Sequence, residues 1–277
     1  MREIAGMREV IGEYKALVLD LWGVVHDGVT PYPGVLACLD ELRAAGVRVV
    51  MLSNAPRRAA AVGDALLRMG ITPDHYHGIV TSGEVTRGML AGDRDPLLAG
   101  WGTRFWHLGP PRDRNLFESL DVDDVPLECA DFILNTGPDD ERDPTDPAAF
   151  DAELQQAASL RLPMLCANPD LEVVRAGKHI ICAGLLAERY RAMGGMVVSV
   201  GKPDGLVYRQ VFDLLGAPRA RILAVGDSLR TDMAGAQAAG IACVWVLGGI
   251  HKDDADPVAA ARKAGLAPDY MMRGLVW

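Results

Sequence analysis

Short apolar runs alternate with stretches of helical periodicity along most of the chain. The first run, 16–19, is uninterrupted and ends at Asp20, which is typical of a strand buried on both faces of a parallel sheet. Further strands are expected at 47–52, 78–82, 196–200, 221–225 and 241–247, and helices at 35–45, 57–69, 205–215 and 233–239. Alternation at this βαβ spacing predicts an α/β fold with a doubly wound, Rossmann-like parallel sheet.

A second α/β rhythm interrupts this pattern in the middle of the chain. Strands expected at 104–108, 132–135 and 163–167 are separated by helices near 113–120 and 146–160 and by a polar, Pro- and Asp-rich stretch at 137–147. We therefore predict two domains, a core formed by 1–83 and 184–277 and an inserted α/β domain formed by 84–183. A helix at 184–193 should return the chain to the core, so strand 196–200 is expected in the first sheet.

Composition and charge exclude several classes of function. Apolar residues make up 49% of the chain and charged residues 23%, as in ordinary globular proteins. The net charge of −9 and the lack of a dense Lys/Arg run disfavour nucleic-acid binding. No run approaches the ~20 apolar residues of a spanning helix, 1–14 lacks a signal-peptide core, and five scattered cysteines without CxxC spacing indicate reduced thiols. We expect a soluble, cytoplasmic protein that binds no membrane.

Polar groups of complementary kinds follow four of the predicted strands: Asp20; Ser53 and Asn54; Lys202; and Asp227 with Asp232. Alone, each has an ordinary explanation as a turn, cap or loop residue. Together at the carboxyl edge of a parallel sheet, they should converge on one crevice. Carboxylates suit Mg²⁺, a hydroxyl and an ammonium suit phosphate, and a carboxylate can attack phosphorus. The pattern therefore favours phosphoryl transfer.

These four motifs, in this order, resemble those of the haloacid dehalogenase-like (HAD) hydrolases over nearly the full length of the chain. The inserted block resembles the large α/β cap of subfamily IIA, the NagD or 4-nitrophenylphosphatase group. That likeness rests on Thr81-Ser82-Gly83 and on Ala167-Asn168-Pro169-Asp170 ahead of Cys182-Ala183-Gly184. The resemblance implies a Mg²⁺-dependent phosphatase for a small phosphorylated substrate, with an aspartyl-phosphate intermediate.

The resemblance also implies a role for each site residue. Asp20 would be the nucleophile and a Mg²⁺ ligand, Asp227 a second ligand, and Asp232 a ligand directly or through water. Ser53 and Asn54 would bind phosphate. Lys202 would be the charge-balancing catalytic cation.

The chain departs from the family's phosphatases at Trp22, where they carry a second Asp that protonates the leaving group. The metal ligand at this position is a backbone carbonyl, which Trp22 still offers. The lost general acid typically contributes ~10²–10⁴-fold in rate. Trp22 either packs between core and cap or stacks on the substrate, and His26 on the same loop either replaces the acid or lines or packs near the site.

Three functions follow from this departure. The first, which we favour, is a phosphatase restricted to leaving groups that need little protonation. The second is a regulatory protein that binds metal and phosphate but turns over slowly. The third is attack by Asp20 at carbon, as in the family's dehalogenases, which use no metal for that step. The substrate, the oligomeric state (a homo-oligomer included) and the cap residues that set specificity stay open, with Asn168 and Asp170 as polar candidates.

Overall fold

The computed structural model describes residues 1–92, 95–175, 178–249 and 256–277. In these ranges the larger sheet, here the core sheet, has seven strands, and every neighbouring pair is parallel. Their order is β1 (Arg2–Glu3), β14 (Tyr270–Met272), β13 (Ala242–Val246), β12 (Ile222–Gly226), β2 (Ala16–Leu19), β3 (Arg48–Ser53) and β4 (Gly78–Thr81). The chain thus builds β2 to β4 outward and later returns to the other side of β2.

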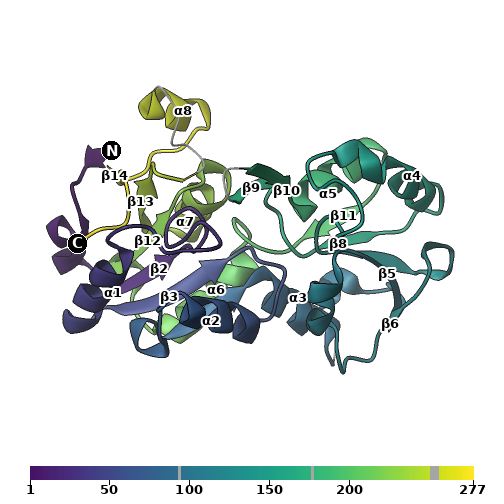
Figure 1. Cartoon of the computed structure of the whole chain (residues 1–277), viewed down its shortest axis with the longest axis horizontal. Helices are drawn as coiled ribbons and strands as arrows, with labels where there is room; N and C mark the ends of the chain where they lie inside the picture. Colours follow the sequence, from purple (N-terminus) through teal and green to yellow (C-terminus); the bar gives the residue numbers. More distant parts are fainter. Residues whose placement is uncertain (93–94, 176–177, 250–255) are drawn as a thin grey trace.

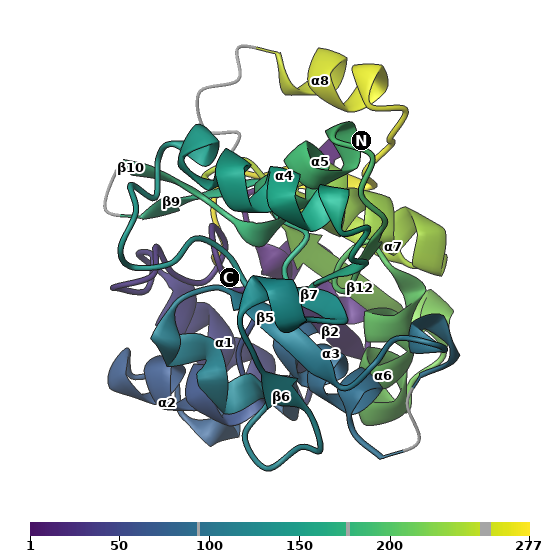
Figure 2. The ribbon, with the colours of Figure 1, turned by 90° about the vertical axis from the view of Figure 1, so that its right-hand side faces the viewer.

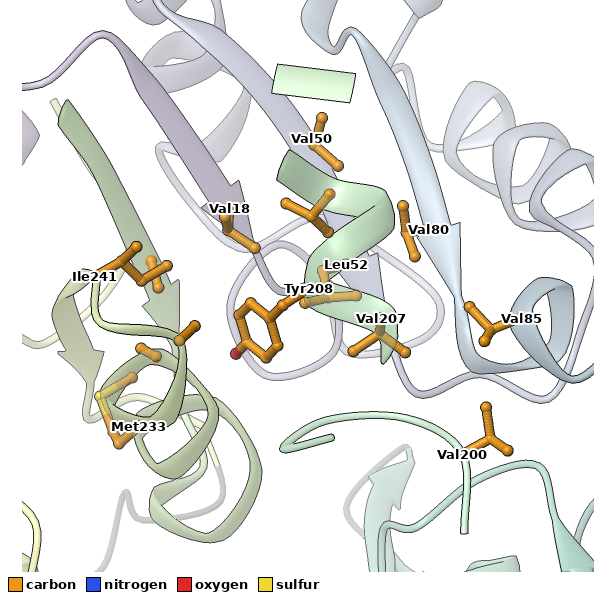
Figure 3. Close-up of a cluster of buried hydrophobic side chains, with 14 of the residues drawn as sticks. Val18, Val50, Leu52, Val80, Val85, Val200, Val207, Tyr208, Met233 and Ile241 are labelled. Atoms are coloured by element: carbon orange, nitrogen blue, oxygen red, sulfur yellow. The ribbon is translucent and has the colours of Figure 1, made fainter. Parts of the chain in front are cut away.

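Helices cover both faces of the core sheet because its strands are apolar on both sides. Leu17 and Leu19 pack with α1 (Val35–Ala44) and α2 (Ala59–Arg68), whereas Ala16 and Val18 pack with α6 (Gly205–Leu215) and α7 (Ala234–Ala239). Figure 3 shows the second of these layers, with Val18 near Tyr208 of α6. The predicted doubly wound α/β sheet is therefore confirmed.

A smaller parallel sheet, here the second sheet, lies beside the core sheet (Figure 1). In the described part of the chain it has five strands, in the order β11 (Val197–Ser199), β8 (Met164–Cys166), β7 (Phe132–Asn135), β5 (Arg104–Leu108) and β6 (Asp123–Asp124). Helices α4 (Asp151–Ser159) and α5 (Ala183–Ala192) pack on one of its faces, and Figure 2 views this end of the molecule. The inserted stretch therefore has its own sheet and helix layer.

Strand β11 is the main departure from the predicted organisation. It was expected in the core sheet, but it pairs in parallel with β8. The physical reason is α5, whose Leu186 and Tyr190 are buried against Met164 of β8, so β8, α5 and β11 form one βαβ crossover. The second sheet thus extends to Ser199, and the predicted return to the core at residue 184 is wrong.

Two further expectations differ from the structure. The helix expected near 113–120 is a short 3-10 segment, Pro111–Leu116, followed by Ser119 with a positive φ of 60°, which does not fit a continuing helix. The stretch after β8 contains an antiparallel hairpin of β9 (Glu172–Arg175) and β10 (Lys178–Ile181), which was not predicted. Each of its strands has four residues, two polar and two adjacent apolar ones, so neither shows the alternation that signals a strand.

The two sheets share a continuous buried apolar cluster. Helix α3 (Ser82–Leu90) contributes Val85 and Met89, which belong to the same cluster as Val50 of β3 and Phe105 of β5. The expected division at residue 84 therefore falls inside α3. Among the helices described, none combines the length and the apolar character needed to cross a bilayer.

The remaining elements connect or flank these layers. They are α8 (Pro257–Lys263), a π-helical turn at Leu229–Met233, and 3-10 turns at Met7–Glu9, Ile11–Glu13, Pro73–His75, Pro96–Leu98, Leu127–Cys129, Pro147–Phe150 and Arg219–Arg221.

Candidate active site

The carboxylates of Asp20 and Asp227 lie directly after two neighbouring strands of the core sheet, at the point where the strand order of the sheet reverses. Strands β2 and β12 are neighbours, with Leu19 opposite Val225, and the Asp20 N–H donates to the Val225 carbonyl at 2.9 Å. Asp227 directly follows β12. Ligands of open α/β sheets bind at such a switch point, outside the carboxyl ends of the strands.

Asp232 completes a cluster of three buried carboxylates with Asp20 and Asp227. One oxygen from each lies within 4.8 Å of the others. Asp232 comes from the turn after β12, and its Oδ2 accepts from the Ser228 N–H at 3.1 Å. Gly23 leaves room for this cluster, because a Cβ there would collide with the Asp227 carboxylate and its φ of 82° favours glycine. The donor set consists of hard oxygens, which suits Mg²⁺.

Lys202 lies against this cluster. Its buried ammonium donates to Asp20 Oδ1 at 2.5 Å and to Asp232 Oδ1 at 2.7 Å. Burial by itself lowers the pKa of Lys202, but the nearby carboxylates of Asp20, Asp232 and Asp170 raise it well above its ordinary value. Lys202 is therefore a fixed cation, as an anion-binding or charge-balancing role requires.

Asn54 holds Lys202 and Asp170 in place. Its Oδ1 accepts from the Lys202 backbone N–H at 2.7 Å, and its Nδ2 donates to Asp170 Oδ1 at 2.8 Å. Ser53, the last residue of β3, accepts from the Ala55 N–H at 3.2 Å. Ser53 lines the cavity, whereas both functional atoms of the Asn54 side chain bond other groups of the protein. Phosphate binding by either residue stays a prediction.

The predicted convergence is observed, but for Lys202 the predicted reason is wrong. Lys202 follows β11, and Asp170 lies in the loop after β8, so both come from the carboxyl ends of the second sheet. The two sheets therefore direct their carboxyl ends at one site. Asp170 was only a polar candidate from the sequence, and Asn168 serves it by accepting its backbone N–H at 2.9 Å.

A cavity of about 600 Å³ opens over these groups. The polar lining residues that follow the strand ends, here called the floor, are Asp20, Ser53, Asn54, Lys202, Asp227 and Asp232. Its apolar wall is formed by Trp22, Tyr32, Leu171, Val173, Leu185 and Leu229. Sequence reasoning missed Tyr32, the leucines, Val173 and the lining residue Arg230, since nothing in their local sequence separates a cavity wall from core or surface.

Trp22 and His26 pack on each other. Of these two, Trp22 is among the described residues that line the cavity and His26 is not. Their rings meet edge to face with centroids 5.5 Å apart. Gly28 lies directly under the far edge of the indole, where any Cβ would collide. The buried His26 accepts from the Gly28 N–H at Nδ1, at 2.9 Å, and burial lowers the pKa of its imidazole to about 4. His26 is thus a neutral packing partner of Trp22.

Comparisons with known proteins agree with this architecture. Haloacid dehalogenase-like hydrolase sequences match at 17–123 and HAD-hydrolase-like sequences at 199–275. A haloacid dehalogenase-like hydrolase from Brucella suis 1330 superposes with a TM-score of 0.86 at 32% identity, covering 99% of this chain and 100% of that one. The 4-nitrophenylphosphatase of Thermotoga maritima gives 0.71 at 25% identity, covering 96% of each chain. Chronophin of Rattus norvegicus is 25% identical over 98% of this chain and 89% of that protein.

Fold and site together define a hydrolase of the phosphatase type that is built on a parallel, Rossmann-like core sheet. The chain belongs to the haloacid dehalogenase-like hydrolase family, in its subfamily IIA with NagD and 4-nitrophenylphosphatase.

Proposed function

We propose that this hydrolase is a Mg²⁺-dependent phosphatase that cleaves a small phosphomonoester through an aspartyl-phosphate on Asp20. The observation that supports this most is the meeting of three buried carboxylates with the Lys202 ammonium on the floor of one cavity. Attack at carbon would need no metal ligands, so the retained Asp227 and Asp232 favour attack at phosphorus.

The carboxylate cluster fits Mg²⁺ in its chemistry. Asp20, Asp227 and the Trp22 carbonyl would hold the ion, and Asp232 would hold it directly or through water. Lys202 already bonds one Asp232 oxygen and the Ser228 N–H the other, which favours the water-mediated role. When bound, Mg²⁺ would neutralise phosphate charge and orient the phosphoryl group.

The chain's own residues would carry the chemical steps. An Asp20 oxygen attacks phosphorus, and the electron pair of the breaking P–O bond goes to the leaving oxygen. Lys202 offsets the charge of the phosphoryl oxygens, and the Ser53 hydroxyl donates to one of them. Water then cleaves the aspartyl-phosphate, which releases inorganic phosphate and restores the carboxylate.

Trp22 makes this mechanism dependent on the leaving group. An indole cannot supply the proton that the family's second Asp supplies, so negative charge stays on the leaving oxygen. Rates should therefore rise steeply with leaving-group acidity, and aryl or acyl phosphates should exceed alkyl sugar phosphates by up to ~10²–10⁴-fold. A plot of log kcat/KM against leaving-group pKa tests this. Trp22→Asp should flatten the plot, and a flat plot for the wild type would contradict the missing acid.

The metal assignment is tested by calorimetry. Asp227→Ala should weaken Mg²⁺ binding by more than about 100-fold, and Asp232→Ala by ~10–100-fold, the range for residues that act through an intermediary. Unchanged affinity in Asp227→Ala would place the metal elsewhere. Turnover that persists after chelation would instead favour the metal-free attack at carbon.

A further inference from the structure

Arg230 brings a second cation to the cavity. Among the lining residues that the structure describes, Lys202 and Arg230 are the cations. Lys202 is buried and bonded to Asp20 and Asp232, whereas the Arg230 side chain is 45% exposed. Lys202 is thus fixed within the carboxylate cluster, and Arg230 is accessible to a molecule that enters the cavity.

The turn that carries Asp232 also positions Arg230. The Ser228 side chain accepts from the Thr231 N–H at 3.3 Å, and the Arg230 guanidinium donates to the Pro169 carbonyl in the loop after β8. A guanidinium has five N–H donors, so this contact orients the group while using only part of it. Arginine held in this way suits a carboxylate or a phosphate, which it binds through two parallel hydrogen bonds.

Glu188 of α5 is a weak competitor for Arg230. Its Oε1 lies 3.9 Å from Arg230 Nη1, beyond hydrogen-bond distance, and both side chains are about half exposed. An ion pair of this kind contributes little to stability. Glu188 is also not among the described residues that line the cavity. An anion that enters the cavity can therefore replace Glu188 at the guanidinium.

The segment Pro169–Asp170 connects the surroundings of the two cations. Pro169 packs so closely on Gly201, next to Lys202, that a Cβ on Gly201 would collide with the proline ring. The carbonyl of the same proline accepts from Arg230. Burial raises the pKa of the Asp170 carboxyl, and the charges of Lys202 and Arg230 are among the effects that lower it. Both cations therefore act on one carboxylate, which places them within the span of one small molecule.

Two other lining acids, Asp27 and Glu172, are oriented by partners that are not among the described lining residues. Asp27 Oδ1 accepts from the N–H groups at 29 and 30, at 2.9 and 2.8 Å. Glu172 Oε2 lies 3.2 Å from His179 Nδ1, and its side chain is 43% exposed, so water and salt screen its charge. These acids leave room for an anion at Arg230.

We propose that the leaving group of the substrate carries a second anionic group, a carboxylate or a phosphate, and that Arg230 binds it. Arg230 is then a specificity-determining residue, and the substrate class is a small phosphomonoester with two anionic ends. This inference rests on the proposed phosphatase function and deepens it. The leaving group still departs with the electron pair of its P–O bond, so the reaction itself is unchanged.

Binding of paired phosphonates separates the second anion from the phosphate-like headgroup. With Mg²⁺ present, calorimetry compares ω-phosphonocarboxylates that have three to five methylene groups with alkylphosphonates of the same length. The wild type should bind the carboxylate of at least one length about tenfold more tightly, as expected for a charge-assisted bidentate contact. Arg230→Met should remove this preference, and Arg230→Lys, which keeps the charge but not the planar fork, should keep part of it. Arg209→Met, exposed on α6, changes the net charge equally and should leave the preference unchanged.

A second variant tests Arg230 while leaving it in place. Glu188→Gln removes the competing carboxylate, so the preference for the phosphonocarboxylate should rise about two- to threefold. An unchanged preference in Glu188→Gln would count against the inference. A preference that persists in Arg230→Met would overturn it, because the metal would then bind the carboxylate. The absence of a preference at every length would also overturn it, and both results would leave the phosphatase intact.

Turnover provides the last readout. The ω-carboxyalkyl phosphate of the preferred length and the alkyl phosphate without the carboxylate have leaving groups of nearly equal acidity, so a difference between them reports the second anion. We expect kcat/KM about tenfold higher for the carboxylated ester, mainly through KM, and equal values in Arg230→Met. Equal kcat/KM in the wild type would overturn the inference. A retained phosphonate preference without hydrolysis of any phosphomonoester would instead refute the proposed function.

Discussion

The core sheet and the second sheet are both parallel and both direct their carboxyl ends at the cavity, yet they contribute different things. The core sheet contributes Asp20, Ser53 and Asp227 at its strand ends. The second sheet contributes Lys202 and, in the loop after β8, Asp170. The three clustered carboxylates and the Ser53 hydroxyl therefore come from the core-sheet side, whereas Lys202 comes from the second-sheet side together with the Asp170 carboxylate.

This division makes the site depend on the contact between the sheets. Lys202 bonds Asp20 and Asp232 across that contact, and Asn54 bonds both Lys202 and Asp170. Buried charges of opposite sign stabilise each other only while they stay paired. The chemical groups are thus assembled by tertiary structure, and each side can be broken separately.

The largest effect should come from the core-sheet side. Asp20→Asn should abolish turnover, with a loss of at least about 10⁴-fold, because an amide cannot serve as the attacking oxygen. The fold should persist, since asparagine is nearly isosteric. Phosphate release measures the loss, and mass spectrometry checks for deamidation. The exposed Asp74→Asn on the 3-10 turn before β4 is the matched control. Wild-type rates in a verified Asp20→Asn protein would remove Asp20 from the mechanism.

A substitution of Lys202 on the second-sheet side should lower the rate less than Asp20→Asn does, and it should also lower the stability of the fold. Lys202→Met keeps the side-chain length but leaves Asp20 and Asp232 without their cation. Turnover should fall ~10²–10³-fold, and the free energy of unfolding should fall by about 3–5 kcal/mol, as when one partner of a buried ion pair is removed. Phosphate release and urea denaturation measure the two effects. Lys178→Met, exposed on β10, is the control, and equal behaviour of both variants would mean that the second sheet supplies no essential charge.

The same comparison explains what could be predicted from the sequence. Strands β2 and β12, and β3 after its first residue Arg48, are apolar runs with polar residues at or directly after their ends, so local sequence was enough to place Asp20, Ser53 and Asp227. Strand β11 has the same appearance, and its sheet depends on where the apolar face of α5 packs, which periodicity does not reveal. For that reason the position of Lys202 at the site was predicted, but the sheet that carries it was not.

The apolar wall could not be predicted for a related reason. Leu171, Val173 and Leu185 are ordinary apolar residues whose role depends on facing a cavity rather than a core. Trp22 was conspicuous only because the resemblance placed an acid there. The packing that fixes it requires Gly28 and His26, whose contact with the indole appears only in three dimensions.

A partly buried chain of polar side chains leads from β5 of the second sheet back to the loop after β3. His107 Nε2 lies 2.9 Å from Thr136 Oγ1, Thr136 bonds Asp113, and Asp113 Oδ1 accepts from Arg57 Nε at 3.2 Å. Burial lowers the pKa of His107 to about 4, whereas an unfolded histidine titrates near 6.5. The imidazole is therefore neutral in the folded state over a range where the unfolded chain takes up a proton.

The smallest predicted effect is a change in pH-dependent stability, and it concerns His107 on the second-sheet side. Between pH 6.5 and about 4 the unfolded state binds more protons at His107 than the folded state, so this residue's contribution to stability falls as pH falls. Most carboxylates titrate alike in wild type and His107→Gln, and glutamine can still bond Thr136. The free energy of unfolding of His107→Gln, taken relative to that of the wild type, should therefore be about 2 kcal/mol higher at pH 4.5 than at pH 7. Urea denaturation at both pH values measures the difference. His179→Gln, exposed on β10, is the control, and parallel pH dependence of wild type and His107→Gln would show that His107 is protonated within the fold.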